Sequence, residues 1–223
     1  MLKKFLKSLF LIVIFCFMSG FSDIKQQDDY TCAPVCAANC IVNYNSFKNS
    51  DNELIQYFGK TAKTTKKGTK TNNLCKALAK YFKQNKRSAI IKYDGIRPVD
   101  KIFKSEKPLD IIEELQNGKS VILNIGIYEF DGKTYHRKYG HYVNAIDINP
   151  KGQILLTDPY EKGSAFYVDI EPPESLNIRH NKDDNERIRK NKFNIKSLKG
   201  IPYLKDNETA FLNGIISINL IAY

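Results

Sequence analysis

Four polar residues in this chain have the types and the spacing that nucleophilic catalysis by a thiol requires. Gln26 precedes Cys32 by six residues, and His141 and Asp158 follow in that order much further along the chain. A cysteine attacks a carbonyl carbon as its thiolate, an imidazole exchanges the proton, and a carboxylate holds the imidazole in one tautomer. The set therefore predicts acyl transfer through a thioester, most simply the hydrolysis of a peptide or amide bond.

The residues around Cys32 support this chemistry. Cys32 opens a stretch whose apolar positions repeat at helical spacing, and Pro34 is tolerated in the first turn of a helix. The positive end of a helix dipole and a neighbouring imidazolium both stabilise a thiolate. The backbone N–H of Cys32 is one of the unpaired donors of that helix end, and Gln26 supplies a second amide donor. Together they predict an oxyanion site.

The histidine is chosen from three, because the chain contains only His136, His141 and His180. His141 stands just before an apolar strand expected over 142–148, so a rigid sheet would present its ring. His136 lies in a turn-rich approach and is the second choice, while His180 lies in a charged stretch that is a poor place for a base. Asp158 ends the next strand, and two antiparallel strands joined by a tight turn bring their far ends together.

Helical patterns come first in the chain and most strand patterns second. We expect Asn72 or Asn73 to cap one helix and Pro108 to begin another. The order indicates an α+β fold, in which N-terminal helices pack on a C-terminal antiparallel β-sheet. The expected helices cover residues 32–44, 54–58, 74–82 and 109–116, and the expected strands cover residues 88–93, 120–129, 142–148, 153–157, 165–170 and 214–222.

The first 22 residues have the composition of a secretory signal peptide. An uncleaved membrane anchor is the alternative, although the apolar run is shorter than the roughly 20 residues that span a bilayer. The prediction is a secreted or periplasmic protein. The positive start, the apolar core and the small-x-small cleavage site lie at Lys3, Lys4 and Lys7, at 9–17 and at 20–22.

The mature part, 23–223, is expected to form one domain with a charged, turn-rich surface insertion over 171–206. The chain has 35 Lys and Arg residues against 24 Asp and Glu residues. The lysines among them are spread along the whole chain, whereas a nucleic-acid-binding protein is expected to concentrate its basic residues on one face. The composition therefore favours a solvated basic surface, and we expect a peptide or protein substrate, no nucleic acid, no cofactor, and no membrane after signal cleavage.

Cys36 and Cys40 follow Cys32 at four-residue steps, so the three cysteines share one helix face. Such a row suggests a metal site, but three thiols along two helical turns span too far for one tetrahedral ion. We therefore assign Cys36 and Cys40 to the core face of the helix and expect no metal. A disulfide from either of them to Cys75 stays open, because its geometry cannot be read from a sequence.

Four motifs together carry a resemblance to a known family. They resemble the papain-like cysteine peptidases of the bacteriocin-processing type, that is, the double-glycine leader peptidase family and its stand-alone relatives. The likeness extends from residue 24 to about residue 169. In chain order the motifs are Gln26-x5-Cys32-Ala-Pro, Gly118-Lys119-Ser120-Val121-Ile122-Leu123, Gly140-His141-Tyr142-Val143 and Thr157-Asp158-Pro159.

The resemblance implies a papain-like fold and a role for each matching residue. Asp28 matches an acidic position common in the family, and Ala33 departs from the pattern, which usually has glycine after the nucleophile. Leader-cleaving members are normally fused to a transporter, and no such segment is present here, so the resemblance implies a stand-alone secreted peptidase. The implied roles are nucleophile for Cys32, general base and acid for His141, orienting residue for Asp158 and oxyanion donor for Gln26.

Other functions stay open at this stage. A transamidase or a peptidoglycan amidase would use the same three residues and differ in the acyl donor or in what resolves the thioester. A papain-like binding module without catalysis would keep Cys32 as a small buried residue, His141 as a core histidine and Asp158 as a turn residue.

Overall fold

The computed structural model of the chain describes residues 28–44, 50–160, 164–172, 178–179 and 193–221. The expected signal peptide, Gln26 and His180 lie outside these residues. No helix in the described part is both long enough and apolar enough to cross a membrane. The helices are α2 (Cys32–Val42), α3 (Asp51–Thr61), α4 (Thr71–Gln84) and α5 (Ile111–Gln116), and the strands are β1 (Ser88–Gly95), β2 (Ser120–Phe130), β3 (Tyr135–Ile148), β4 (Ile154–Asp158), β5 (Ser164–Glu171), β6 (Ile178–Arg179), β7 (Lys196–Lys199) and β8 (Glu208–Ile221).

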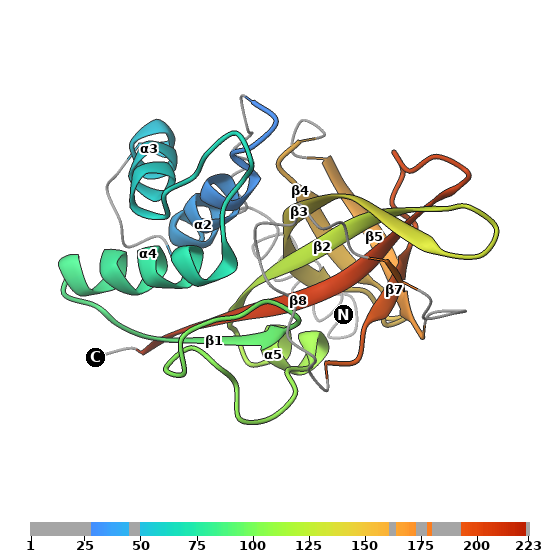
Figure 1. Ribbon diagram of the computed structural model, residues 1–223. Coiled ribbons are helices and arrows are strands. Elements are labelled where there is room, and N and C mark those ends of the chain that lie inside the picture. The colour runs from blue at the N-terminus through green and yellow to red at the C-terminus, as the bar shows by residue number, and fades with distance from the viewer. Residues whose placement is uncertain (1–27, 45–49, 161–163, 173–177, 180–192, 222–223) are drawn as a thin grey trace, which may run out of the picture.

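The strands of the described part form one sheet in the order β1-β8-β2-β3-β4-β5-β7, and β7 also pairs with β8. The strands from β8 to β7 therefore close into a barrel, while β1 extends the sheet from the outer edge of β8. The barrel pairings are antiparallel, and only the short β6 lies parallel to its neighbour, β3. Figure 1 shows the barrel on one side and α2, α3 and α4 gathered on the other. The predicted combination of helices with an antiparallel sheet is confirmed.

The helix α3 begins with a reciprocal cap. Ser50 Oγ accepts a hydrogen bond from the N–H of Glu53 at 3.4 Å, and Glu53 Oε2 accepts one from the N–H of Ser50 at 2.9 Å. This capping box satisfies two donors that a helix start leaves unpaired, so the helix extends to both sides of the predicted 54–58.

Two other helix starts differ from the prediction. The helix α4 begins without a side-chain cap, so the cap expected from Asn72 or Asn73 is wrong. Asn72 instead exchanges hydrogen bonds with Asp100, at 2.9 and 3.0 Å, and ties the helix to the loop after β1. The helix α5 begins later than expected, because Asp110 accepts the N–H of Glu113 at 3.0 Å and caps it there.

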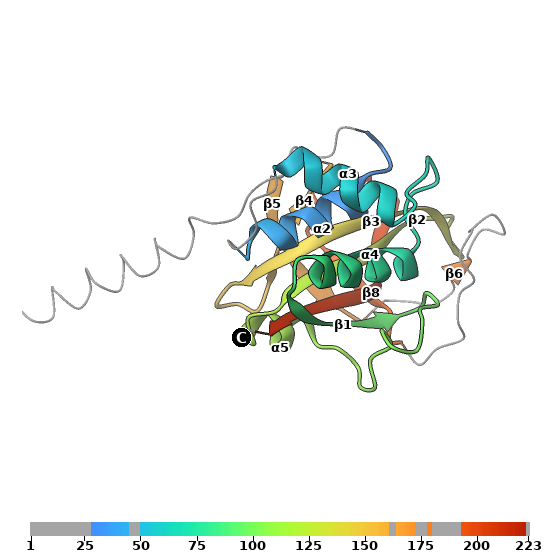
Figure 2. The same ribbon diagram turned by 90° about the vertical axis from the view of Figure 1, so that its left-hand side faces the viewer.

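The helix α2 is buried along nearly its whole length. Its residues from Cys32 to Ile41 are all buried, as expected for a helix that is apolar around its circumference. The neighbours that cover it are α3, α4, β2 and β3. Figure 2 shows the three helices as a layer in front of the strands. The start of α2 is therefore held between the helical layer and the sheet.

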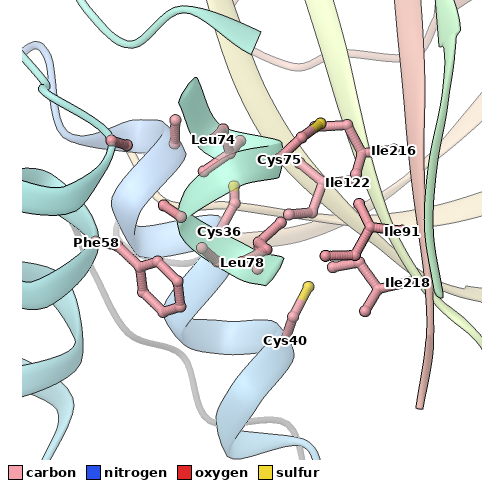
Figure 3. Packing of buried hydrophobic residues seen from close by; sticks show 14 of the residues in the cluster. Cys36, Cys40, Phe58, Leu74, Cys75, Leu78, Ile91, Ile122, Ile216 and Ile218 are labelled. Carbon is pink, nitrogen blue, oxygen red and sulfur yellow. The ribbon is translucent and has the colours of Figure 1, made fainter. Parts of the chain in front are cut away.

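The sheet separates the two larger hydrophobic cores of the described residues. In Figure 3, side chains of α2, α3 and α4 pack against isoleucines of β1, β2 and β8. Along β2 the side chains alternate, so that Ile122 joins this first core and Leu123 joins the second, inside the barrel. Burial on both faces explains why β2 is apolar along most of its length. The barrel core includes Leu123, Ile125, Val143, Leu156, Val168, Leu198 and Leu212.

The strands β3 and β8 are longer than their apolar patterns predict. β3 begins at Tyr135 rather than at residue 142, and β8 begins at Glu208 rather than at residue 214. Both added segments pair with the far half of β2, residues 125–130. Cross-strand pairing rather than local propensity therefore decides where these strands start. His141 consequently lies inside a strand and not at its entrance.

The end of the predicted surface insertion, 171–206, is part of the fold. The strand β7 lies within it and completes the barrel, and Leu198 is only 1% exposed. Ile201 is buried as well. Residues 173–177 and 180–192 of the insertion lie outside the described residues. Because the few apolar residues are scattered among charged ones, this segment shows no clear strand pattern in the sequence.

Candidate active site

Cys32 is the first residue of α2 and its side chain is nearly buried, with 8% exposed. The chain enters the helix through a turn in which Asp28 Oδ1 accepts the N–H groups of Tyr30 at 3.0 Å and Thr31 at 2.9 Å. The first bond of the helix runs from the N–H of Val35 to the carbonyl of Thr31 at 3.0 Å. The N–H of Cys32 precedes that bond, so it belongs to the donors that a helix start offers to an anion.

His141 and Asp158 form a buried pair. His141 Nε2 lies 2.7 Å from Asp158 Oδ1, and the two residues are 8% and 0% exposed. Two further donors hold the carboxylate: the N–H of Tyr160 reaches Oδ1 at 2.8 Å, and the hydroxyl of Tyr203 reaches Oδ2 at 2.5 Å. With both of its oxygens bonded, the carboxylate is fixed and can hold the imidazole in one orientation.

The side chain of Cys32 also acts on the imidazole of His141 and helps to raise its pKa. Because Nε2 is bonded to Asp158, Nδ1 is the ring nitrogen left for the sulfur. Burial lowers the pKa of His141, but the hydrogen bonds to Asp158 and Cys32 and the charges of both groups outweigh it and raise the pKa to about 10. Burial raises the pKa of Asp158, but the hydrogen bond and charge of His141, together with the hydrogen bonds from Tyr203 and Tyr160, outweigh burial and lower this pKa. An imidazolium at neutral pH, beside the sulfur, follows from this arrangement.

The helix start and the sheet are held together by side chains that flank His141 in β3. Asn144 Nδ2 donates to the carbonyl of Cys36 at 3.1 Å and lies 3.2 Å from Cys40 Sγ. The hydroxyl of Tyr142 bonds the hydroxyl of Thr71 at 2.9 Å. These contacts connect β3 to α2 and α4, so the position of His141 relative to α2 does not depend on one contact alone.

A groove of about 390 Å³, here called the Cys32 groove, opens beside the sulfur. Its lining includes Cys32, Asn124 of β2, and Gly140 and Tyr142, the two neighbours of His141. A larger hollow of about 880 Å³, here called the α5 hollow, lies against α5, β4 and β5. None of the three residues Cys32, His141 and Asp158 lines the α5 hollow, so we take the Cys32 groove as the candidate substrate site.

Cys36 and Cys40 belong to the hydrophobic core, as predicted. Both are free thiols and point into the packed layer in Figure 3, so neither forms the disulfide to Cys75 that the sequence left open. Burial raises the pKa of Cys36 well above its ordinary value, helped by Cys32, Cys40 and Asp158. Burial also raises the pKa of Cys40 to about 12, although hydrogen bonds from Asn144 and Ser120 lower it in part. Both therefore stay protonated and unreactive at neutral pH.

The remaining candidates lie elsewhere. His136, the second choice, is in the β2–β3 hairpin and lies 2.6 Å from Asp131 Oδ2. Gln26, the expected oxyanion donor, is outside the described residues, as is His180. Among the described residues, no group of three or more His, Cys, Asp and Glu side chains could hold a metal ion.

Sequence reasoning missed two residues of this site, Tyr203 and Asn124. Tyr203 lies in the segment that was expected to be a surface insertion. The apolar residues Ile201 and Leu204 beside it are the sequence signal that could have pointed to a buried segment. Asn124 interrupts the apolar run of β2, and only 5% of its surface is exposed. A polar side chain is unusual at so buried a position.

Comparison with known proteins supports a relationship to peptidases. The model of the family described as Peptidase C39 like matches residues 18–178. Eight chains of solved structures match, and one of them is the peptidase domain of Streptococcus ComA, described as a bi-functional ABC transporter involved in a quorum sensing pathway. That match has 16% identity, covers 65% of this chain and 82% of that chain, and has a TM-score of 0.40. No curated protein matches the chain.

Proposed function

The chain belongs to the Peptidase C39 like family and is a cysteine peptidase, and we propose that it hydrolyses peptide bonds with Cys32, His141 and Asp158 as its catalytic residues. The observation that carries this proposal is the buried His141–Asp158 pair, whose imidazole has its pKa raised by Cys32, the first residue of α2. These three residues come from α2, β3 and the end of β4, so their meeting is a property of the fold and not of one local motif. The proposal includes a papain-like fold for the domain.

In the proposed reaction the thiolate of Cys32 attacks the carbonyl carbon of the scissile bond. The carbonyl oxygen becomes an oxyanion, which the N–H of Cys32 and the side chain of Gln26 stabilise. As the C–N bond breaks, His141 gives its Nδ1 proton to the leaving amine, and a thioester remains on Cys32. His141 then takes a proton from water, the hydroxide attacks the thioester, and the carboxylic acid leaves as the thiolate is restored. Asp158 orients the imidazole throughout.

Selective labelling of Cys32 tests this proposal. A peptide with an acyl-mimicking, thiol-directed warhead should modify Cys32 in the folded protein under reducing conditions. Cys36 and Cys40 should stay unmodified, because burial keeps them protonated. Mass spectrometry of proteolytic fragments gives the site and the rate. Labelling of all three at the same rate, or of Cys32 only after denaturation, would favour a binding module without catalysis.

We also propose that residues 1–22 are a cleaved signal peptide and that the mature enzyme is secreted or periplasmic. The lysine-rich start and the short apolar core of this segment support the proposal. Expression in a bacterial host should yield extracytoplasmic protein whose first residue is Asp23, as read by N-terminal sequencing. Full-length protein with an intact Met1 in the membrane fraction would instead establish an uncleaved anchor.

A further inference from the structure

The Cys32 groove is strongly cationic. Among the described residues that line it, seven side chains are positive and only Asp29 is negative. One of the seven, Lys138, is paired with Glu208 at 2.6 Å, so its charge is largely compensated. The positive residues are Lys63, Lys66, Lys67, Lys70, Arg97, Arg137 and Lys138.

This charge is not a simple consequence of the lysine-rich composition. The α5 hollow is larger, yet its described lining has four lysines and five carboxylates. The excess of basic residues over the chain is therefore not distributed evenly between the two hollows. It gathers at the one that contains the sulfur of Cys32. A groove lined mostly by one sign of charge concentrates ligands of the opposite sign.

Four of the cations belong to one well-defined loop, residues 62–70, between α3 and α4. Thr65 and Gly68 exchange backbone hydrogen bonds at 3.2 and 2.8 Å, and they place Lys66 and Lys67 at an exposed tip. The hydroxyl of Tyr142 bonds the carbonyl of Thr69 at 3.4 Å, so the loop is tied to β3 next to His141. None of the four lysines of this loop forms an ion pair with a described carboxylate.

Asn124 supplies a second observation that points to a ligand. It lines the same groove, is 5% exposed, and its Oδ1 has no hydrogen-bond partner among the described residues. A buried acceptor left unpaired is unfavourable, because it has lost its hydrogen bonds to water without gaining another. A peptide backbone N–H entering the groove would satisfy it. Sulfur, lysines and an unpaired acceptor in one groove therefore suit an extended peptide that carries negative charge.

We propose that the Cys32 groove selects peptides with acidic side chains close to the scissile bond, with the lysines of loop 62–70 binding the carboxylates and Asn124 Oδ1 accepting a backbone N–H. The proposal rests on the proposed function, because it names the substrate class of that same site. The lysines act as charges in a solvated groove, so their effect falls as salt screens them.

Binding to the Cys32→Ala protein tests the proposal without requiring turnover. Two fluorescent ten-residue peptides are compared by anisotropy, one with four glutamates and one with glutamines in their place. We expect the glutamate peptide to bind at least about tenfold more tightly at low salt, and the difference to shrink at high salt. Equal affinities, or a difference that salt does not reduce, would overturn the proposal.

Two double variants localise the effect. Lys66→Glu with Lys67→Glu reverses charges at the loop tip and should weaken glutamate-peptide binding by about tenfold. Lys80→Glu with Lys101→Glu makes the same change in net charge at exposed positions that line neither hollow, and it should leave binding within about twofold. The same loss in both variants would mean that only net charge matters, and would overturn the assignment to the loop.

A third variant and a second polyanion test the backbone contact. Asn124→Leu should weaken the binding of both peptides by a similar factor. The binding of inorganic polyphosphate should not change, since polyphosphate has no N–H to donate. Equal sensitivity of all three ligands, or no effect on the peptides, would overturn the role of Asn124. If the wild-type protein neither labels at Cys32 nor cleaves any peptide, the proposed function fails, while these binding results still decide what the groove selects.

Discussion

Turnover should be lost when Cys32 is replaced by alanine, with kcat/KM falling by on the order of 10⁴-fold or more, as for other covalent nucleophiles. Neither Cys36 nor Cys40 can replace it, because both are buried and stay protonated at neutral pH. Substrates can be found by mass-spectrometric mapping of products from a proteome-derived peptide mixture. Product formation by the purified variant is then followed on the best of them.

The matched control is Cys36→Ala, one helical turn away in the same buried face of α2. It removes a thiol of the same size from the core and should lower the free energy of unfolding by about 1 kcal/mol while leaving kcat/KM nearly unchanged. Retained turnover in the Cys32 variant, or equal losses in both, would remove Cys32 from the mechanism. Products that carry an added amine in place of a new carboxylic acid would identify a transamidase.

Replacing His141 by alanine should lower kcat/KM by on the order of 10³-fold or more, because the group that gives and takes the proton is removed. The control is His136→Ala, since that ring is paired with Asp131 in the β2–β3 hairpin and does not line the Cys32 groove. It should keep wild-type activity. Full activity of His141→Ala, or loss of activity in His136→Ala, would show that His141 is not the general base.

The pH profile gives a separate test of His141. Since its pKa is raised to about 10, the imidazolium that gives its proton to the leaving amine persists through the neutral range and is lost as pH rises through about 10. The wild-type rate should therefore fall on that alkaline limb. A fall centred near pH 6.5, the ordinary value for histidine, would show that the contacts with Asp158 and Cys32 do not form in solution.

The same shift predicts how stability depends on pH. The pKa of His141 is higher in the folded than in the unfolded protein, so the protonated ring stabilises the fold fully below about pH 6.5. This stabilisation is lost progressively as pH rises through about 10. Urea unfolding of the wild type and of His141→Ala should therefore differ most near pH 6 and least above pH 10. A difference that does not change with pH would contradict the shifted pKa.

The candidate site residues Cys32, His141 and Asp158 could be chosen from the sequence. The cysteine at the start of an apolar helix, the histidine beside a strand and the aspartate at the end of the next strand are each marked by local pattern, and such patterns follow from the periodicity of helices and strands. The scarcity of histidine made the choice among candidates straightforward. The apolar run at 120–129 likewise predicted the strand β2.

Only the tertiary structure decided which distant segments meet at those residues. Tyr203 contacts Asp158 across 45 positions of sequence, β7 closes the barrel from within a segment that looks polar, and the cations of the Cys32 groove come from separate parts of the chain. A local sequence pattern indicates the periodicity of one helix or strand and which of its faces is buried. Which elements become neighbours depends on strand register and on packing between residues far apart in the chain, and these are properties of the whole fold.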